Sequence, residues 1–211
     1  MKCMSFIDEQ FRNHGKDIRV LEIGHGFSPD LMLRFQSKHE VWGVDENQGL
    51  HYFDSSKWEE NYQANIVNTC PHVKLVRGLV GSTEFPADLP VGYFDVVYSI
   101  SILEEVTVPV LRAIVRSASE LLRPGGWLIG THDLKGAVLP DRLKAYFDFH
   151  RECGLDLGDI PDPASVTVDW EYALIEHPAM VMLAYQMATP EETRKYWGHW
   201  TTMFTAAQKS S

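Results

Sequence analysis

The stretch VLEIGHGFSP (residues 20–29) places a short apolar run directly before two glycines. Apolar runs of this length bury as strands, whereas glycine exposes main chain and tolerates positive φ angles. The pattern predicts a strand over residues 18–24 that ends at a bound ligand. Gly24 and Gly26 would let that ligand approach bare backbone.

Further apolar runs of strand length follow, with helix-like patterns between them. Several are nearly continuous rather than alternating, as expected of strands buried on both faces of a parallel sheet. The runs cover residues 18–24, 40–45, 73–79, 94–103 and 127–131. Helix starts are predicted at Ser28-Pro29-Asp30, at Ser56 with Glu59, and at Thr107. This alternation predicts a doubly wound α/β domain.

Beyond residue 133 the pattern changes, and a helix is predicted over 141–153. Two strand-like runs, 166–175 and 180–187, have the spacing of an antiparallel pair at the sheet edge. A last helix is predicted from Thr189, and the aromatic residues that share one of its faces are Tyr196, Trp200 and Phe204.

The totals indicate one domain and exclude several classes of partner. With 211 residues, of which 45% are hydrophobic, the chain suits one well-buried domain over 1–211. A formal net charge of -10 repels phosphate backbones, and Lys and Arg are scattered singly, so no nucleic-acid partner is expected. No apolar run approaches the length of a membrane span, so no membrane partner is expected. Cys3, Cys70 and Cys153 lack paired spacing, which predicts reduced thiols, no bound metal and a cytoplasmic location.

An acid ends the second predicted strand. The run VWGVDEN places Asp45 about 20 residues after the glycines, where a carboxylate accepts two hydrogen bonds from a ribose diol. Ligands of open α/β sheets lie beyond the carboxyl ends of the strands, so the glycines and Asp45 are expected at the same edge. Together they predict an adenosine-containing cofactor and leave two candidates, a dinucleotide and S-adenosylmethionine.

The loop is poorly suited to a dinucleotide. Pro29 stands where the dinucleotide pattern has a third glycine and removes a backbone N–H donor, while Asp30 adds a negative charge to the first helical turn. Both changes oppose a doubly charged pyrophosphate. No tyrosine is followed by lysine four residues later, as a short-chain dehydrogenase would require. A nicotinamide-dependent oxidoreductase is therefore the least favoured hypothesis.

With these motifs the chain resembles the class I S-adenosylmethionine-dependent methyltransferases. The resemblance rests on VLEIGHGFS, VWGVDEN, FDVVYSISILEEV and LLRPGGWLIG, in the family's order, and covers residues 18–131. It implies a Rossmann-like doubly wound seven-stranded sheet, mostly parallel with an antiparallel C-terminal strand pair. It also implies a core over 18–133, acceptor-side and C-terminal elements over 134–211, and S-adenosylmethionine as the cofactor.

The resemblance further implies which residues contact the cofactor. The glycine loop would face the methionine moiety, with His25 acting through its backbone, and Asp45 would hold the ribose. The segment after the third strand would flank the adenine, and the end of the fourth strand would border the sulfonium. The residues so assigned are Glu22, Gly24, His25, Gly26, Asp45, Glu46, Gly78, Leu79, Val80, Ser99 and Ile100. The chain departs from the family pattern at three positions. Ser28 replaces the third glycine of the loop, Leu79 replaces an acid that commonly follows the third strand, and Glu105 replaces a frequent histidine after the fourth strand.

Methyl transfer from a sulfonium is an in-line displacement, so holding acceptor and methyl in line is the protein's main contribution. A general base is needed only where the nucleophile arrives protonated. His132, in GTHD after the fifth predicted strand, is the candidate base, and Asp133 is a candidate to orient it. Glu105, beside Glu104, is a candidate to orient a cationic amine. Each of these residues also has an interpretation without a catalytic role. His132 would then be a histidine of a surface loop, and Glu104 and Glu105 would be acids at the start of the next helix.

The leading hypothesis is an S-adenosylmethionine-dependent methyltransferase acting on a small-molecule acceptor through oxygen, nitrogen or carbon. The acidic composition and the small amount of chain beyond the core fold favour it. The alternative keeps the fold without catalysis, as a cofactor-binding or scaffolding subunit. The aromatic residues of the last predicted helix, Trp197, Trp200 and Phe204, are candidates for core contacts or for a homodimer contact.

Overall fold

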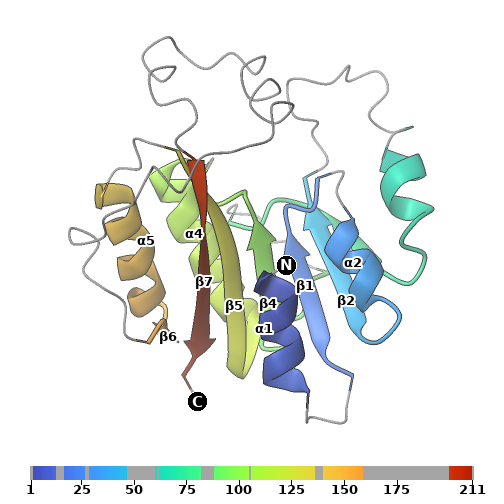
Figure 1. The fold of residues 1–211 in the computed structure, drawn as a ribbon, viewed down its shortest axis with the longest axis horizontal. Helices are drawn as coiled ribbons and strands as arrows, with labels where there is room; N and C mark the ends of the chain where they lie inside the picture. The colour runs from blue at the N-terminus through green and yellow to red at the C-terminus, as the bar shows by residue number, and fades with distance from the viewer. Residues whose placement is uncertain are drawn as a thin grey trace.

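The computed structural model describes residues 2–12, 17–26, 29–46, 60, 62–81, 88–104, 106–135, 140–158 and 200–210. Seven strands form one sheet in the order β3-β2-β1-β4-β5-β7-β6 (Figure 1). They are β1 (Arg19–Ile23), β2 (Glu40–Asp45), β3 (Lys74–Arg77), β4 (Phe94–Ile100), β5 (Leu122–Lys135), β6 (Leu155–Asp156) and β7 (Trp200–Lys209). Strands β1 to β5 are parallel, whereas β7 runs antiparallel to β5 and β6. The predicted Rossmann-like fold is confirmed.

Helices cover both faces of this sheet (Figure 1). On one face lie α1 (Lys2–Phe11), α2 (Asp30–Phe35) and the π-helix η2 (Gln63–Val67). On the other lie α4 (Val108–Leu121) and α5 (Pro140–Glu152). The strand order reverses between β1 and β4, and in open α/β sheets ligands bind beyond the carboxyl ends of the strands at such a switch point.

Side chains of β4 divide the core between the two faces. Val97 packs with Leu21 and with Val115 of α4 on one face, whereas Val96 and Tyr98 belong to the core on the α1 face. All three β4 side chains are fully buried. Burial on both faces explains why this strand is apolar without alternation.

The five predicted parallel strands are confirmed, β2 with its predicted boundaries and the other four with shifted ones. The largest shift is in β5, which begins at Leu122 rather than at residue 127 and continues to Lys135. The helices predicted from Thr107 and over 141–153 are α4 and α5. Helix α1 was not predicted from the sequence.

The predicted last helix is wrong over the part that the structure describes. Trp200 and Phe204 lie in β7, with Phe204 opposite Thr131 of β5. A spacing of four residues puts two side chains on one face of a strand as well as of a helix, so this spacing did not distinguish the two. Phe204 packs against Phe6 of α1, with ring centroids 5.7 Å apart. This segment is therefore not helical at these positions, and Phe204 packs against the core, as one of its two predicted roles required. The homodimer contact stays a prediction.

Other predictions lie outside the described residues. They are the helix cap at Ser28, the capping box at Ser56 and Glu59, the strand pair over 166–175 and 180–187, and the aromatic residues Tyr196 and Trp197.

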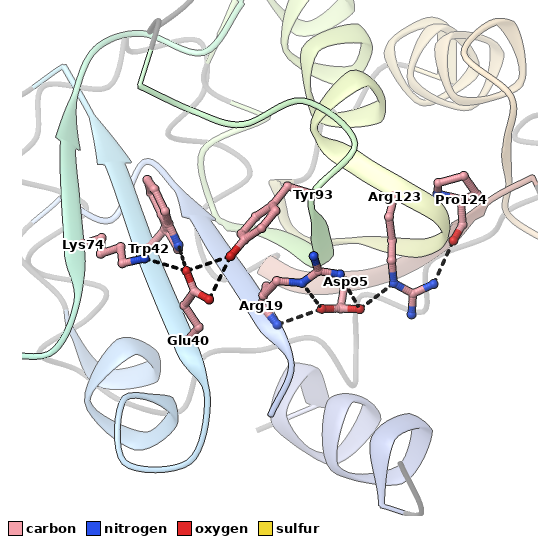
Figure 2. A network of polar contacts seen from close by, with 8 residues as sticks. All are labelled: Arg19, Glu40, Trp42, Lys74, Tyr93, Asp95, Arg123 and Pro124. Carbon is pink, nitrogen blue, oxygen red and sulfur yellow. Dashed lines mark hydrogen bonds and ion pairs between the residues drawn. The ribbon is translucent and has the colours of Figure 1, made fainter. Parts of the chain in front are cut away.

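Two carboxylates join the amino ends of the parallel strands (Figure 2). Asp95 in β4 accepts hydrogen bonds from the backbone N–H of Arg19 (2.8 Å), from its Nε (2.9 Å) and from Nε of Arg123. Glu40 in β2 accepts from Nζ of Lys74 (2.7 Å), Nε1 of Trp42 (2.9 Å) and the hydroxyl of Tyr93 (2.9 Å). Every strand from β1 to β5 thus contributes a residue to this network.

Candidate functional site

The carboxyl ends of β1 and β2 bring the glycine loop and the acid of the second strand together. The backbone N–H of Gly26 donates to Oδ2 of Asp45 at 2.9 Å, and the N–H of Gly24 donates to the carbonyl of Val44 at 2.9 Å. The φ angles are +74° at Gly24 and +52° at Gly26, a region that favours glycine. The loop and Asp45 therefore lie on one rim, within the span of one adenosine.

The two glycines differ in the space around them. A Cβ at Gly24 would lie 2.8 Å from Cγ1 of Ile102, so this glycine lets the segment after β4 pack against the loop. A Cβ at Gly26 would meet no atom of the described residues within 4 Å. Gly26 therefore offers a bare backbone next to Asp45, which suits the close approach of a ligand.

Glu22, near the end of β1, has a buried carboxyl group. It is 4% exposed, and its Oε2 accepts a hydrogen bond from the hydroxyl of Tyr98 at 2.6 Å. Burial raises the pKa of Glu22 to about 8; the charges of Asp45 and Asp30 also raise it, while the Tyr98 hydrogen bond lowers it. This carboxyl group therefore changes protonation near neutral pH. Its partner, Tyr98, was not predicted from the sequence.

The side chain of His25 supports the glycine loop. Its Nδ1 donates to the carbonyl oxygen of Gly26 at 3.0 Å, and its ring stacks on Tyr62 with centroids 6.0 Å apart. Burial lowers the pKa of His25, while Asp45 and the Gly26 carbonyl raise it, and the lowering prevails. A Cβ at Gly43 would lie 3.0 Å from the His25 ring, so bare backbone in β2 makes room for it. The expectation that His25 acts only through its backbone missed this packing role.

The segment after β3 lies beside Asp45. The N–H of Gly78 donates to the Asp45 carbonyl at 2.9 Å, and the carbonyl of Glu46 accepts a hydrogen bond of 3.3 Å from the last residue of β3. Leu79 is 41% exposed, whereas Val80 is 2% exposed and belongs to the core. Of the residues expected to flank an adenine, Leu79 therefore offers an exposed apolar side chain, whereas that of Val80 is buried.

Buried hydroxyls lie near the carboxyl ends of β4 and β5. Ser99 is 1% exposed, and within the described part of the chain neither its Oγ nor Oγ1 of Thr131 has a hydrogen-bond partner. Ile100 pairs with Thr131 in the ladder and is half-buried. The next residue, Ser101, has a φ of +51°, which is uncommon without glycine. Unpaired buried hydroxyls beside such a backbone are typical of functional positions.

His132 lies within β5, not in a surface loop. It is 4% exposed, and its Nε2 lies 3.3 Å from Oγ1 of Thr205 in β7. Its ring meets Tyr146 of α5 edge-on, with centroids 4.4 Å apart. The candidate base therefore belongs to a buried polar cluster. The side chain of Asp133 and all of Glu105 lie outside the described part of the chain, so their roles stay predictions.

The described residues contain neither a candidate metal cluster nor a candidate membrane span. Within them, no group of three or more His, Cys, Asp or Glu side chains could hold a metal ion. None of the described helices is long and apolar enough to cross a membrane.

Fold and site together define a class of protein. A glycine loop after β1, an acid at the end of β2 and a seven-stranded sheet with antiparallel β7 are the parts of a Rossmann-like enzyme that binds an adenosine-containing cofactor. Residues 21–130 match a family model described as a methyltransferase domain. The chain belongs to this family and is an S-adenosylmethionine-dependent methyltransferase.

One curated protein and two solved structures are similar to this chain. The ubiquinone biosynthesis O-methyltransferase of Nitrosospira multiformis is 25% identical over 190 residues, covering 74% of this chain and 70% of that protein. The crystal structure of the cyclase SpnF is 16% identical, with a TM-score of 0.61 over 99% of this chain and 81% of that one. Geranyl diphosphate C-methyltransferase of Streptomyces coelicolor, solved with S-adenosylhomocysteine, is 13% identical, with a TM-score of 0.55 over 99% and 80%. These two structural likenesses show the shared fold.

Proposed function

We propose that this chain transfers a methyl group from S-adenosylmethionine to a small-molecule acceptor at the carboxyl ends of β1, β4 and β5. The hydrogen bond between Gly26 and Asp45 carries the proposal, because it joins bare backbone and a carboxylate on one rim. The net charge of -10 favours a small acceptor over a nucleic acid. Two relatives bear names of small-molecule methyltransferases, one for ubiquinone biosynthesis and one for geranyl diphosphate.

In this proposal each strand end binds a different part of the cofactor. Asp45 binds the ribose hydroxyls; a carboxylate accepts several hydrogen bonds at once, so binding the ribose is compatible with holding Gly26. Leu79 covers the adenine with its exposed side chain. The remaining assignments are Glu22, Gly24, His25 and Gly26 around the methionine moiety, Glu46, Gly78 and Val80 around the adenosine, and Ser99 and Ile100 beside the sulfonium.

When bound, S-adenosylmethionine supplies an electrophilic methyl group on a positively charged sulfur. The chain's own residues hold the acceptor in line with that methyl, an effect worth up to about 7–11 kcal/mol in favourable cases. Where the nucleophilic atom carries a proton, the His132 imidazole takes it, which adds roughly 10²–10⁴-fold to the rate. Glu105 and Asp133 are the further candidates for orienting the acceptor and His132.

Isothermal titration with S-adenosylmethionine and S-adenosylhomocysteine tests cofactor binding. Asp45→Ala removes the ribose acceptor and the partner of the Gly26 N–H, so we expect binding to weaken by about 1–3 kcal/mol. Asp156→Ala is the matched control, since Asp156 is exposed and its Oδ1 also accepts a glycine N–H, that of Gly158, at 2.8 Å. We expect this control to leave the affinity unchanged. An unchanged affinity in Asp45→Ala, or no binding by the wild type at millimolar cofactor, contradicts the assignment.

Turnover is tested separately from binding. Incubation with S-adenosylmethionine labelled at the methyl group, together with a fractionated small-molecule extract, shows whether label moves to an acceptor. Binding without transfer to any fraction would favour the scaffolding alternative. That alternative is motivated by Glu105, which stands where the family often has histidine.

A further inference from the structure

The carboxyl group of Glu22 is buried near the glycine loop without a positively charged side chain beside it. It is 4% exposed, and the hydroxyl of Tyr98 contacts its Oε2 at 2.6 Å. Within the described part of the chain Glu22 forms no ion pair. Asp95, by contrast, is buried between Arg19 and Arg123 (Figure 2). A buried carboxyl group that lacks a cation favours its neutral, protonated form.

In the part of the chain that the structure describes, the side chains that interact electrostatically with Glu22 are all neutral or negative. They are the thiols of Cys3 in α1 and Cys70 after η2, the phenol of Tyr98 in β4, and the carboxyl groups of Asp30 in α2 and Asp45 in β2. Burial raises the pKa of Glu22 to about 8, and the charges of Asp45 and Asp30 add to this rise against the Tyr98 hydrogen bond. The charged amino terminus acts on Cys3, whose pKa it lowers against the larger effect of burial.

The position of Glu22 in the sheet brings this carboxyl group close to the glycine loop. Gly24 follows two residues later, and a strand advances about 3.3 Å per residue, so the two backbones are about 7 Å apart. Glu22 pairs with Gly43 of β2, where a Cβ would lie 3.0 Å from the ring of His25. Nε2 of His25 is itself buried without a hydrogen-bond partner among the described residues. Such buried polar groups are typical of a site that a ligand completes.

The two forms of the cofactor differ in charge. S-adenosylmethionine has a carboxylate, an ammonium and a sulfonium group and therefore carries a net positive charge. Loss of the methyl group leaves S-adenosylhomocysteine neutral overall. In a buried site, a unit charge at about 10 Å shifts the protonation equilibrium of a carboxyl group by about tenfold or more. An ionised Glu22 is therefore stabilised by the first form and much less by the second.

We propose that Glu22 selects S-adenosylmethionine over S-adenosylhomocysteine by charge, because its carboxyl group is protonated in the protein without cofactor and loses this proton when S-adenosylmethionine binds. This inference rests on the proposed function, in which Glu22 lies at the methionine moiety. The proton passes to the solvent, and no bond of the cofactor changes on binding. After methyl transfer the sulfonium charge is gone, so Glu22 takes up a proton from the solvent again, which weakens the binding of the product.

The pH dependence of binding has a fixed direction in this proposal. Because S-adenosylmethionine binds best to the ionised carboxyl group, its affinity should rise as the pH approaches the pKa of Glu22, about 8. We expect a rise of at least about twofold from pH 6 to pH 7, with little change for S-adenosylhomocysteine. The α-amino group of both forms stays mostly protonated in this range. His25, whose pKa is lowered chiefly by burial, affects both forms alike.

Isothermal titration of the full chain at pH 7, in two buffers with different ionisation enthalpies, counts the protons released on binding. We expect about half a proton per S-adenosylmethionine and clearly less per S-adenosylhomocysteine. Glu22→Gln keeps an acceptor for Tyr98 but has no proton to release, so both forms should release the same number. Its preference for S-adenosylmethionine should fall by about twofold or more. Glu9→Gln removes an exposed carboxylate of α1 and is expected to release protons as the wild type does.

No proton release by the wild type, or equal release with both forms, overturns the proposal, and this measurement decides even if Glu22→Gln does not fold. An unchanged difference between the two forms in a folded Glu22→Gln variant overturns it as well, because another group then releases the proton. Binding of neither form contradicts the proposed function and this inference with it. Binding without proton release removes the inference alone and leaves the proposed function in place.

Discussion

At the amino end of the sheet the buried carboxylate of Asp95 is surrounded by donors, whereas at the carboxyl end the buried hydroxyl of Ser99 has no partner among the described residues. Burial alone raises the pKa of Asp95, but the hydrogen bonds of Arg19 and Arg123 outweigh it and hold this pKa below its usual value. Polar groups at this end therefore contribute to stability. Figure 2 shows how these contacts connect neighbouring strands.

The carboxyl end of the same strands has the opposite character. There, burial raises the pKa of Glu22 to about 8, and Gly24, Gly26 and Ser101 have positive φ angles. Of these features, the buried carboxyl group of Glu22 and the positive φ of Ser101 cost folding free energy, whereas glycine adopts a positive φ without strain. The paired end therefore stabilises the sheet, while the other end keeps unpaired polar groups where we propose that the cofactor binds.

The largest expected effect is at the paired end. Asp95→Asn removes the charge between Arg19 and Arg123, and we expect a loss of about 3 kcal/mol in the free energy of unfolding, measured by urea titration. Cofactor affinity is expected to stay the same. Because the pKa of Asp95 is lowered on folding, the loss should be full at neutral pH and disappear as the pH falls through that lowered value.

The exposed pair Arg112–Glu152 is the control for Asp95→Asn. Both side chains are about half exposed or more, so Glu152→Gln is expected to cost less than about 1 kcal/mol. Equal losses in the two variants would show that the amino-end network adds no more than a surface ion pair.

The next effect concerns Glu22 at the binding end. Its pKa rises from 4.5 to about 8 on folding, so its favourable contribution is full below about pH 4.5 and is lost as the pH rises towards 8. We expect wild-type stability to fall by about 2–3 kcal/mol between about pH 5 and about pH 7 because of this group. Glu22→Gln keeps an acceptor for Tyr98 and removes the charge, so its thermal stability is expected to vary less over that range.

Other titratable groups lie near Glu22, so the pH series requires a control variant. Cys3 of α1, Asp30 and Asp45 all interact with its charge, and Cys3 has a pKa raised to about 11, outside the range tested. Glu120→Gln, on the exposed surface of α4, removes a carboxylate elsewhere and should leave the wild-type pH dependence unchanged. A pH dependence that persists in Glu22→Gln assigns the effect to another group.

The glycine loop and the strand–helix alternation could be predicted because short stretches of sequence determine them. An apolar run before Gly24 and Gly26 specifies a strand end, and the acid that ends the next strand lies at the same edge because parallel strands share their direction. The hydrogen bond from Gly26 to Asp45 therefore joins two elements that the sequence had already placed.

Partners that come from distant segments could not be predicted. Tyr98 lies 76 residues from Glu22, and Thr205 lies 73 residues from His132, so no local pattern links either pair. The spacing of Trp200 and Phe204 fits both a helix and a strand. The segment forms a strand because it pairs with β5, which lies far away in the sequence. The interpretation of His132 as a surface-loop residue failed because β5 extends beyond the predicted boundary.

A smaller effect is expected at Gly26, where comparison with a second glycine separates the cost of backbone strain from the loss of ligand binding. Gly26→Ala and Gly154→Ala both place a methyl group at a positive φ, +52° and +69°, with no described atom within 4 Å. We expect each to cost about 1 kcal/mol of stability. Only Gly26→Ala should weaken S-adenosylhomocysteine binding, by about tenfold or about 1.4 kcal/mol, in isothermal titration. Equal affinities in the two variants would place the ligand away from Gly26.

The smallest expected change in stability is at Ser99. Its Oγ is buried without a hydrogen-bond partner among the described residues, so Ser99→Ala removes a desolvated group and should change the free energy of unfolding by less than about 0.5 kcal/mol, or raise it. Ser119 is the matched control, since it is also buried but its Oγ donates to the carbonyl of Cys153 at 2.9 Å, and Ser119→Ala should cost about 1 kcal/mol. The opposite pattern is expected for cofactor affinity, which should fall in Ser99→Ala and stay constant in Ser119→Ala. A Ser99→Ala variant that loses stability and keeps its affinity would mean that this hydroxyl serves the fold, as Asp95 does, and not the ligand.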